Sequence, residues 1–298
     1  MTKPGVIVVT GATGWVGRTL LDYLFQVLPS LEFDQRVRAF GSRSGFLTLR
    51  SQLRVTIYPL SLLPQFARQE QIQSLFHAAF LTPDRANDLG LERYCEINES
   101  ITRVVCDALR LRPTARVVLF SSGAAQFAAA TYPQRVQHPP SQCYGLLKLQ
   151  EEISLSGLAA TLVLRIYALT GRFIRDPRRY ALGDFLCCAF RNESILIRNT
   201  KSVIRGYVSA FDLSALAWEW AQSSDEPTAA PLHAVAETIS LLDLAEVITS
   251  IYDLPPVHSS IDQSLPADVY TASSKHFLAI LERYGHVRMS IERQIRDT

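Results

Sequence analysis

The feature that most restricts the fold lies near the start of the chain, where apolar residues lead directly into regularly spaced glycines. Val6–Thr10 has the β-branched, apolar composition of a buried strand. Gly11, Gly14 and Gly17 follow at intervals of three residues, and an amphipathic pattern then continues to Val27. Glycine permits both the tight turn and the close backbone approach that a strand–loop–helix junction requires. The sequence therefore predicts a strand, a glycine loop and a helix in this order.

Short apolar runs continue to alternate with helical patterns through the first half of the chain. The expected strands are Val6–Thr10, Val37–Phe40, Val55–Tyr58, Ser74–Ala78, Arg116–Ser121 and Thr161–Ile166. The expected helices are Gly14–Val27, Leu91–Leu111 and Cys143–Leu158. Aliphatic strands separated by helices favour a parallel sheet covered on both faces. The predicted fold class is therefore α/β, with a doubly wound parallel sheet of the Rossmann type.

The glycine loop also has the spacing of a phosphate-binding turn. Gly-x-x-Gly-x-x-Gly between a strand and a helix lets the backbone approach a pyrophosphate, whose oxygens bind the free N–H groups of the helix N-terminus. We therefore expect a dinucleotide to bind here. The predicted cofactor-binding residues of the loop are Gly11, Thr13, Gly14, Trp15, Val16 and Gly17.

The end of the second strand indicates which dinucleotide binds. An NAD site usually places a carboxylate there, against the ribose 2′-hydroxyl. No Asp or Glu follows Phe40 closely, and the chain continues as Gly41-Ser42-Arg43. Ser42 and Arg43 are suited to a 2′-phosphate, which favours NADP(H). NAD(H) is the alternative, with Arg43 then a solvated loop residue.

The character of the sequence changes after Arg172, where arginines become frequent. We expect a dinucleotide-binding domain over residues 1–172, rejoined by about 203–222. Residues 173–202 and 223–298 would form a smaller, mostly C-terminal, substrate-binding lobe. Within it, residues 240–252 have helical spacing, with Ser240 as the N-cap.

Composition and charge argue against several other classes. The net charge of +2 over 298 residues gives no basic surface for nucleic acid or a membrane, and no apolar run reaches the roughly 20 residues of a membrane span. The run at residues 6–9 is too short for a secretory signal, so we expect a cytoplasmic protein. No metal site is predicted, because metal-ligand spacing is lacking among the five cysteines, Cys95, Cys106, Cys143, Cys187 and Cys188.

Tyr144-Gly145-Leu146-Leu147-Lys148, taken with the glycine loop, resembles the extended short-chain dehydrogenase/reductase family, which contains nucleotide-sugar epimerases, dehydratases and ketoreductases. Further matches follow in order: His77-Ala78-Ala79, Asn98, Phe120-Ser121-Ser122, Leu164-Arg165 with Gly171, Arg205–Leu213, and Ser274-Lys275 before Leu281 and Gly285. The resemblance implies that the cofactor is also bordered by His77, Ala78, Ala79, Asn98, Ser121, Tyr144 and Lys148. It further implies a homodimer paired through the helices at 91–111 and 143–158.

Tyr144 and Lys148 are four residues apart, so they lie on one face of a helix. A tyrosine has a reference pKa of about 10, too high for ready proton exchange near neutrality. A nearby ammonium stabilises the phenolate and makes the tyrosine a usable general acid or base. Hydride exchange with a nicotinamide needs such a group, because interconversion of an alcohol and a ketone moves a hydride and a proton together.

The family's third catalytic residue, a Ser or Thr that binds the substrate oxygen, is expected at the position of Gly123. Its neighbour Ser122 is therefore the candidate for this role, and Ser122 and Gly123 are predicted to border the substrate. One alternative is that Gly123 leaves room for another group or a substrate hydroxyl to supply this bond. The other is that Ser121 and Ser122 only satisfy backbone groups at the end of the strand.

The resemblance assigns Arg205 to the substrate, because the matching arginine of related sugar enzymes binds a diphosphate. A guanidinium fits the geometry of a phosphate. Gly206, Ser209 and Ala168 depart from an acid, a histidine and an asparagine that are frequent in the family. The small-molecule partner predicted from Arg205 is a nucleotide sugar.

These observations favour a reductase, in which NADPH delivers a hydride to a keto group of a nucleotide-linked deoxysugar and Tyr144 donates the proton. The second hypothesis is a nucleotide-sugar 4-epimerase or dehydratase that holds NAD tightly. The others are a non-catalytic dinucleotide sensor, against which the Tyr144–Lys148 pair argues, and a ketoreductase of a non-sugar substrate.

Overall fold

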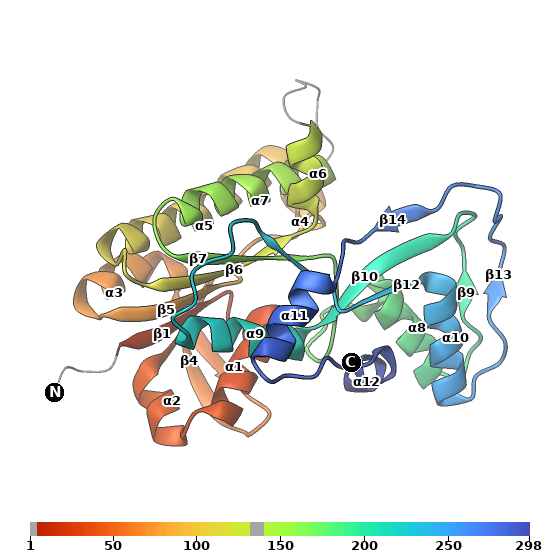
Figure 1. The fold of residues 1–298 in the computed structure, drawn as a ribbon, viewed down its shortest axis with the longest axis horizontal. Helices are drawn as coiled ribbons and strands as arrows, with labels where there is room; N and C mark the ends of the chain where they lie inside the picture. The colour runs from red at the N-terminus through yellow and green to blue at the C-terminus, as the bar shows by residue number, and fades with distance from the viewer. Residues whose placement is uncertain (1–4, 132–139) are drawn as a thin grey trace. The chain divides into compact units, whose positions relative to one another are not determined.

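The computed structural model describes residues 5–131 and 140–298, which form two compact units (Figure 1). The first unit contains Met1–Arg165 and Ala217–Leu232. The second contains Ile166–Leu216 and His233–Thr298. The chain therefore leaves the first unit after Arg165, returns to it for Ala217–Leu232, and leaves it again.

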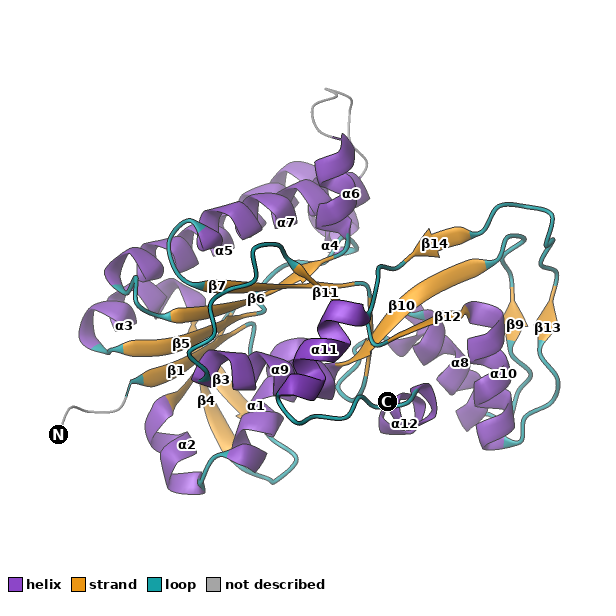
Figure 2. Cartoon of the chain, in the orientation of Figure 1, coloured by secondary structure: helices purple, strands orange, loops and turns teal. Residues whose placement is uncertain are grey.

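An eight-stranded sheet, in the order β11-β7-β6-β5-β1-β2-β4-β3, is built mainly from the first unit (Figure 2). Its strands are β1 (Val6–Thr10), β2 (Val37–Gly41), β3 (Gly45–Thr48), β4 (Arg54–Pro59), β5 (Ile72–His77), β6 (Arg116–Ser122), β7 (Thr161–Ile166) and β11 (Leu232–Ala234). β1 pairs in parallel with both β2 and β5, whereas the edge strand β3 runs antiparallel to β4. The six predicted strands are confirmed. The sheet order reverses at β1, and this is where doubly wound sheets bind ligands.

Helices cover both faces of this sheet, so the doubly wound arrangement is confirmed. α1 (Trp15–Val27) and α2 (Ser30–Arg36) lie on one face, and α3 (Leu63–Gln69), α5 (Leu91–Leu111) and α7 (Pro140–Ser156) lie on the other (Figure 1). The shorter elements are η1 (Leu60–Leu62), α4 (Arg85–Leu89) and α6 (Ala124–Thr131). The boundary between the units falls within α9 (Ala210–Gln222), after Leu216. In the described ranges, no helix combines the length and the apolar character needed to cross a bilayer.

The core of the first unit lies between the sheet and α5. Every residue of β1 is buried, as expected for a central strand covered on both faces. Val105 and Leu109, four residues apart on α5, join Val8 and Leu75 in one cluster of buried side chains. This packing fixes the carboxyl ends of β1 and β5 beside each other.

The second unit contains two small sheets and the remaining helices. One sheet has the order β12-β10-β14, with β8 also paired to β10, and the other pairs β13 with β9. The strands are β8 (Ala168–Thr170), β9 (Leu196–Ile197), β10 (Val203–Ser209), β12 (Glu237–Ser240), β13 (His258–Ser259) and β14 (Asp268–Tyr270). The other elements are η2 (Pro177–Arg179), α8 (Ala181–Phe190), α10 (Leu241–Tyr252), α11 (Lys275–Arg283) and α12 (Ile291–Asp297). The predicted cap of α10 is confirmed, because the Ser240 hydroxyl accepts the Asp243 N–H at 3.0 Å.

The boundary between the units differs from the expected one. The first unit ends at Arg165, and the segment that returns to it is Ala217–Leu232. Residues 203–209 were expected to rejoin the dinucleotide-binding domain, but β10 pairs with β8, β12 and β14 of the second unit. Strand pairing connects distant parts of the chain, so the local pattern of these residues did not reveal their partners.

Candidate active site

The glycine loop lies at the carboxyl end of β1 and packs against the end of β5. Gly11 has a φ of +67°, which L-residues with side chains rarely adopt. A Cβ at Gly11 would lie 2.5 Å from the carbonyl carbon and oxygen of Ala78, and 2.6 Å from the Ala79 nitrogen. A Cβ at Gly17 would lie 2.3 Å from the Gly11 oxygen. Glycine is therefore required at both positions for the loop to close.

The N-terminus of α1 is suited to an anion. Gly14 is its N-cap, no side chain of the described residues caps it, and its first turn contains no acidic residue. The first N–H groups of a helix carry partial positive charge and bind phosphate oxygens. The half-buried Thr13, Trp15 and Val16 surround this end. The close-packed glycines and the uncapped helix fit the pyrophosphate of a dinucleotide.

The predicted specificity residues follow β2, beside the glycine loop. A Cβ at Gly41, the last residue of β2, would lie 3.8 Å from the Thr13 methyl group. Ser42 and Arg43 come next and are exposed. The structure therefore brings these two residues to the same edge of the sheet as the glycine loop.

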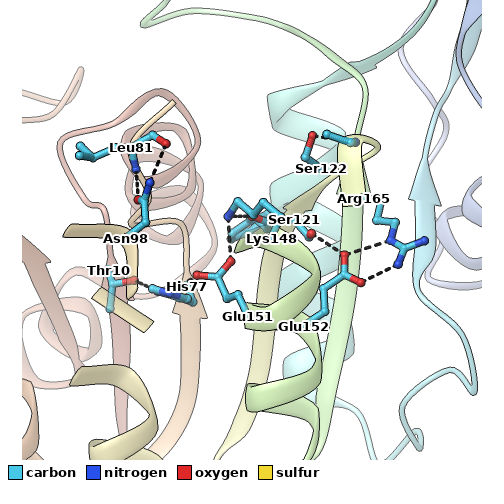
Figure 3. A network of polar contacts seen from close by, with 12 residues as sticks. Thr10, His77, Leu81, Asn98, Ser121, Ser122, Lys148, Glu151, Glu152 and Arg165 are labelled. Atoms are coloured by element: carbon cyan, nitrogen blue, oxygen red, sulfur yellow. Dashed lines mark hydrogen bonds and ion pairs between the residues drawn. The ribbon is translucent and has the colours of Figure 1, made fainter. Parts of the chain in front are cut away.

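A network of buried polar groups links β1, β5 and α7 (Figure 3). The Glu151 carboxylate lies 3.0 Å from His77 Nε2 through one oxygen, and 2.8 Å from Lys148 Nζ through the other. His77 Nδ1 lies 2.6 Å from the hydroxyl oxygen of Thr10. His77 was predicted to border the cofactor through its backbone, and its side chain points into this network.

Lys148 is held by three different groups and is only 3% exposed. Its ammonium bonds Glu151, donates to the Phe120 carbonyl at 3.2 Å, and lies 3.9 Å from the centre of the Phe80 ring. The Phe80 ring also meets the half-buried Tyr144 edge-on, with ring centres 5.8 Å apart. Phe80 therefore contacts both members of the Tyr144–Lys148 pair.

Burial by itself would raise the pKa of Glu151, because a carboxylate loses its hydration in the interior. The electrostatic effects of Lys148 and His77, and the hydrogen bonds from both side chains, act in the opposite direction and are stronger. The pKa of Glu151 is therefore held below its usual range. Glu151 is ionised near neutral pH, and the buried network contains a compensated negative charge.

The serines at the end of β6 have different surroundings. The Ser121 hydroxyl donates to Glu152 at 2.5 Å, and the same carboxylate pairs with Arg165 of β7 (Figure 3). The Ser122 hydroxyl accepts the N–H of Ala124 at 3.2 Å, at the start of α6. Gly123, which lies between Ser122 and Ala124 in the chain, is buried. The Ser121 side chain thus joins β6 to α7, and Ser122 is the serine placed at the turn where the substrate is predicted.

The side chain of Asn98, which is predicted to border the cofactor, is hydrogen-bonded to the backbone of Leu81. Its side-chain oxygen accepts the N–H of Leu81 at 2.8 Å, and its amide donates to the Leu81 carbonyl at 3.4 Å. Asn98 is fully buried on α5. It fixes the loop that carries Ala78, Ala79 and Phe80 past the glycine loop.

Arg205 lies in the second unit, on β10. Its guanidinium bonds the Asp268 carboxylate at 2.8 Å and the Asp268 carbonyl at 2.9 Å. It also donates to the carbonyl of Ile204 at 3.0 Å. The predicted phosphate ligand is therefore already paired with an acid on the neighbouring strand β14, and about a quarter of its side chain is exposed.

Three residues of this region were not predicted: Phe80, Glu151 and Glu152. Glu151 is three residues after Lys148, which places the two on one face of α7. The sequence did contain one signal for the two acids: Glu151 and Glu152 are adjacent in a helix that is expected to cover an apolar sheet. Their partners, His77 and Arg165, lie on strands that only the sheet order brings to this helix.

A parallel sheet whose order reverses at β1, with a glycine loop and an uncapped helix N-terminus at that point, defines a Rossmann-like α/β protein. Within this class, the model of the NAD dependent epimerase/dehydratase family matches residues 7–230, and the chain belongs to this family of enzymes. None of the curated protein sequences matches the chain.

Solved structures with the same fold include several nucleotide-sugar enzymes. TunA, a NAD dependent NDP-hexosamine 5,6-dehydratase involved in tunicamycin biosynthesis, is 15% identical, with a TM-score of 0.73 over 99% of this chain and 96% of that chain. The UDP-N-acetylglucosamine 4-epimerase from Methanobrevibacter ruminantium M1, in complex with UDP-N-acetylmuramic acid, is 17% identical, with a TM-score of 0.73 over 100% and 97%. MoeE5 in complex with UDP-glucuronic acid and NAD is 18% identical, with a TM-score of 0.71 over 99% and 97%.

Proposed function

We propose that the chain transfers a hydride to or from a carbon of a nucleotide-linked sugar, with a nicotinamide dinucleotide at the glycine loop and Tyr144 as general acid or base. The observation that carries this proposal is the contact of one ring, Phe80, with both Tyr144 and the Lys148 ammonium. It brings the pair together beside the loop that packs on Gly11. Three solved structures of two similar proteins contain a nucleotide sugar together with NAD, which supports the substrate class.

Each residue has a separate part in this reaction. The bound nicotinamide supplies the hydride donor or acceptor. Tyr144 gives a proton to the substrate oxygen, or removes one, as the carbon is reduced or oxidised. Lys148 stabilises the phenolate that Tyr144 forms. Ser122 is the candidate for a hydrogen bond to the substrate oxygen, and Arg205 is the candidate ligand of the substrate diphosphate.

Two modes of reaction follow from two observations. The relatives named above support an epimerase or dehydratase, in which NAD is reduced and reoxidised without leaving the enzyme. The loop Gly41-Ser42-Arg43, with no acid after Phe40 and Arg43 exposed, supports a reductase that consumes NADPH. The first mode predicts protein purified with NAD bound, and the second predicts an empty protein that binds NADPH more tightly than NADH.

The deciding experiment measures the nucleotide content of the purified protein, then titrates it with NADPH and NADH by fluorescence. Arg43→Ala is compared with Arg50→Ala, which removes another exposed arginine of the same unit. Loss of NADPH preference in Arg43→Ala alone supports the reductase, whereas bound NAD or equal affinities support the epimerase or dehydratase. Tyr144→Phe should keep dinucleotide affinity and lose turnover of UDP-sugars. A protein that binds the dinucleotide but turns over no UDP-sugar or ketone contradicts the proposal and supports a sensor.

We also propose that the protein is a homodimer paired through α5 and α7. The family resemblance implies this pairing, and Ile153 of α7 is 67% exposed, so its side chain is accessible to a partner at that surface. Ile153→Asp should therefore increase the monomer fraction measured by light scattering. Val287→Asp is the matched control, because Val287 is 89% exposed in the second unit. A monomeric wild type at micromolar concentration would contradict the proposal.

A further inference from the structure

Glu151 is a charged group that the proposed reaction does not itself require. It is fully buried on α7, one helical turn after Lys148. A buried carboxylate is costly unless opposite charges and hydrogen bonds compensate it. Here each oxygen has a partner: Lys148 Nζ at 2.8 Å and His77 Nε2 at 3.0 Å (Figure 3). The contacts connect the carboxylate directly to the lysine of the candidate active site.

The imidazole of His77 bridges Glu151 and Thr10. His77 Nε2 lies 3.0 Å from one Glu151 oxygen, and His77 Nδ1 lies 2.6 Å from the Thr10 hydroxyl oxygen. His77 is 1% exposed and has a partner at each ring nitrogen, so the orientation of the ring is fixed. Thr10 and His77 therefore hold Glu151 in the orientation that faces Lys148.

The position and the charge of Lys148 both depend on this carboxylate. The Phe120 carbonyl and the Phe80 ring also contact the ammonium, but Glu151 is the contact that carries a full negative charge. The Glu151 carboxylate lies 2.8 Å from the ammonium and attracts it directly. It also offsets the positive potential that the lysine exerts on Tyr144, because the two charges act on the phenol together.

We propose that Glu151 is a positioning residue for the Tyr144–Lys148 pair: it fixes the ammonium in place and offsets its charge, and so sets the pH range in which the pair works. The catalytic role of the Tyr144–Lys148 pair rests on the proposed function, whereas the effect of Glu151 on the Lys148 ammonium does not. The titratable groups that face Glu151 are Lys148 on its own helix, His77 from β5 and Cys106 from α5. Thr10 of β1 and the Phe120 carbonyl of β6 complete the network with neutral atoms.

The composition of the chain makes a direct test possible. It contains only four lysines, Lys3, Lys148, Lys201 and Lys275. Protein labelled with ¹³C at lysine Cε therefore gives four signals, and Lys148→Arg identifies the signal of Lys148. The chemical shift of this signal is followed against pH in wild type, Glu151→Gln, Glu151→Asp and Glu152→Gln. No cofactor or substrate is needed.

In Glu151→Gln the side chain keeps its size and loses its charge, so the midpoint of the Lys148 titration should fall by about one pH unit or more. Glu151→Asp keeps the charge, so it should restore most of the wild-type midpoint. If Glu151→Gln does not fold, Glu151→Leu, which also removes the charge, takes its place with the same fall expected. Glu152→Gln removes the adjacent buried carboxylate, which binds Ser121 and Arg165, and should leave the Lys148 midpoint in place. Equal midpoints in wild type and Glu151→Gln would overturn the proposal.

A second readout follows Tyr144. Phenolate absorbance near 295 nm, taken as the difference from Tyr144→Phe, should appear at lower pH in Glu151→Gln while Lys148 is still charged. An unchanged lysine titration in a protein that turns over sugars refutes only the role of Glu151. A shifted titration in a protein that binds no dinucleotide refutes only the proposed function. The two failures are therefore distinguishable.

Discussion

Both carboxylate oxygens of Glu152 bind the guanidinium of Arg165, at 2.9 and 2.6 Å. Both side chains are at least nine-tenths buried, and the Ser121 hydroxyl supplies a further hydrogen bond to the carboxylate. The contact ties α7, which carries Tyr144 and Lys148, to β7 and β6. It fixes this helix on the sheet without using any atom of the pair.

Arg165→Met should therefore lower stability strongly. The substitution leaves Glu152 buried without its cation, and breaking a buried ion pair costs about 3–5 kcal/mol. The double variant Arg165→Met/Glu152→Leu removes both charges and should recover most of that loss, because apolar replacement of a buried pair is often neutral. Urea unfolding measures the free energy of unfolding of the single and the double variant. A double variant no more stable than Arg165→Met would contradict this account.

Gly17→Ala tests the close packing of the glycine loop. The added methyl group would lie 2.3 Å from the Gly11 oxygen, so the loop must open for α1 to form. Because the loop is the predicted pyrophosphate site, dinucleotide affinity should fall at least tenfold, about 1.4 kcal/mol. Gly45→Ala is the control, since its added Cβ would have no heavy atom of the described residues within 4 Å, its own residue and chain neighbours aside. Equal affinity of the two variants would show that the loop does not hold the cofactor.

The elements that were predictable from the sequence are those whose local pattern reports their burial. Val6–Thr10 is apolar throughout because both faces of β1 are covered, and Leu91–Leu111 was predicted with the bounds that α5 has. β3 was missed because Gly45–Thr48 is a short edge strand that is mostly accessible to solvent. Its one buried residue, Leu47, gives no periodic signal.

The candidate site likewise contains relationships that the sequence predicts and others that only the fold creates. The spacing of Tyr144 and Lys148 is local, so one helical turn predicts that they share a face. The contact of Glu151 with His77 joins residues that are 74 positions apart, and it exists because the fold brings the end of β5 to α7. No local pattern contains this information. The Arg205–Asp268 pair depends likewise on the parallel pairing of β10 with β14.

Asp268→Asn should strengthen binding of phosphate-containing ligands to the second unit. The Asp268 carboxylate neutralises Arg205 in this structure, and a diphosphate would compete with it for the same guanidinium. The pair is partly exposed, so freeing the arginine should be worth about 1 kcal/mol or less, a gain in UDP affinity of up to about fivefold. Asp262→Asn, an exposed acid bonded to Ser264, is the control for the change in net charge. Weaker UDP binding in Asp268→Asn than in the control would show that Arg205 needs its partner to bind phosphate.

The stability contributed by Glu151 should depend on pH in a definite direction. Its pKa is lowered in the folded protein from the reference value of 4.5, with burial opposing the shift and Lys148 and His77 producing it. The folded state therefore binds the proton less readily than the unfolded state, and stability is lost as the pH falls. The contribution is complete above the unfolded value and disappears as the pH falls through the folded one.

Glu151→Gln lacks this titration. Its free energy of unfolding should therefore be lower than that of wild type by about 3 kcal/mol near neutrality, and this deficit should be constant above about pH 5.5. The deficit should shrink steadily below pH 4.5, where wild type begins to lose the ionised carboxylate that Gln cannot provide. Urea unfolding of both proteins between pH 3.5 and 8 measures the difference. Glu99→Gln, an exposed change on α5, should follow wild type throughout. A deficit that stays equal from neutrality to pH 3.5 would mean that the loss comes from altered packing, and that the charge of Glu151 does not stabilise the fold.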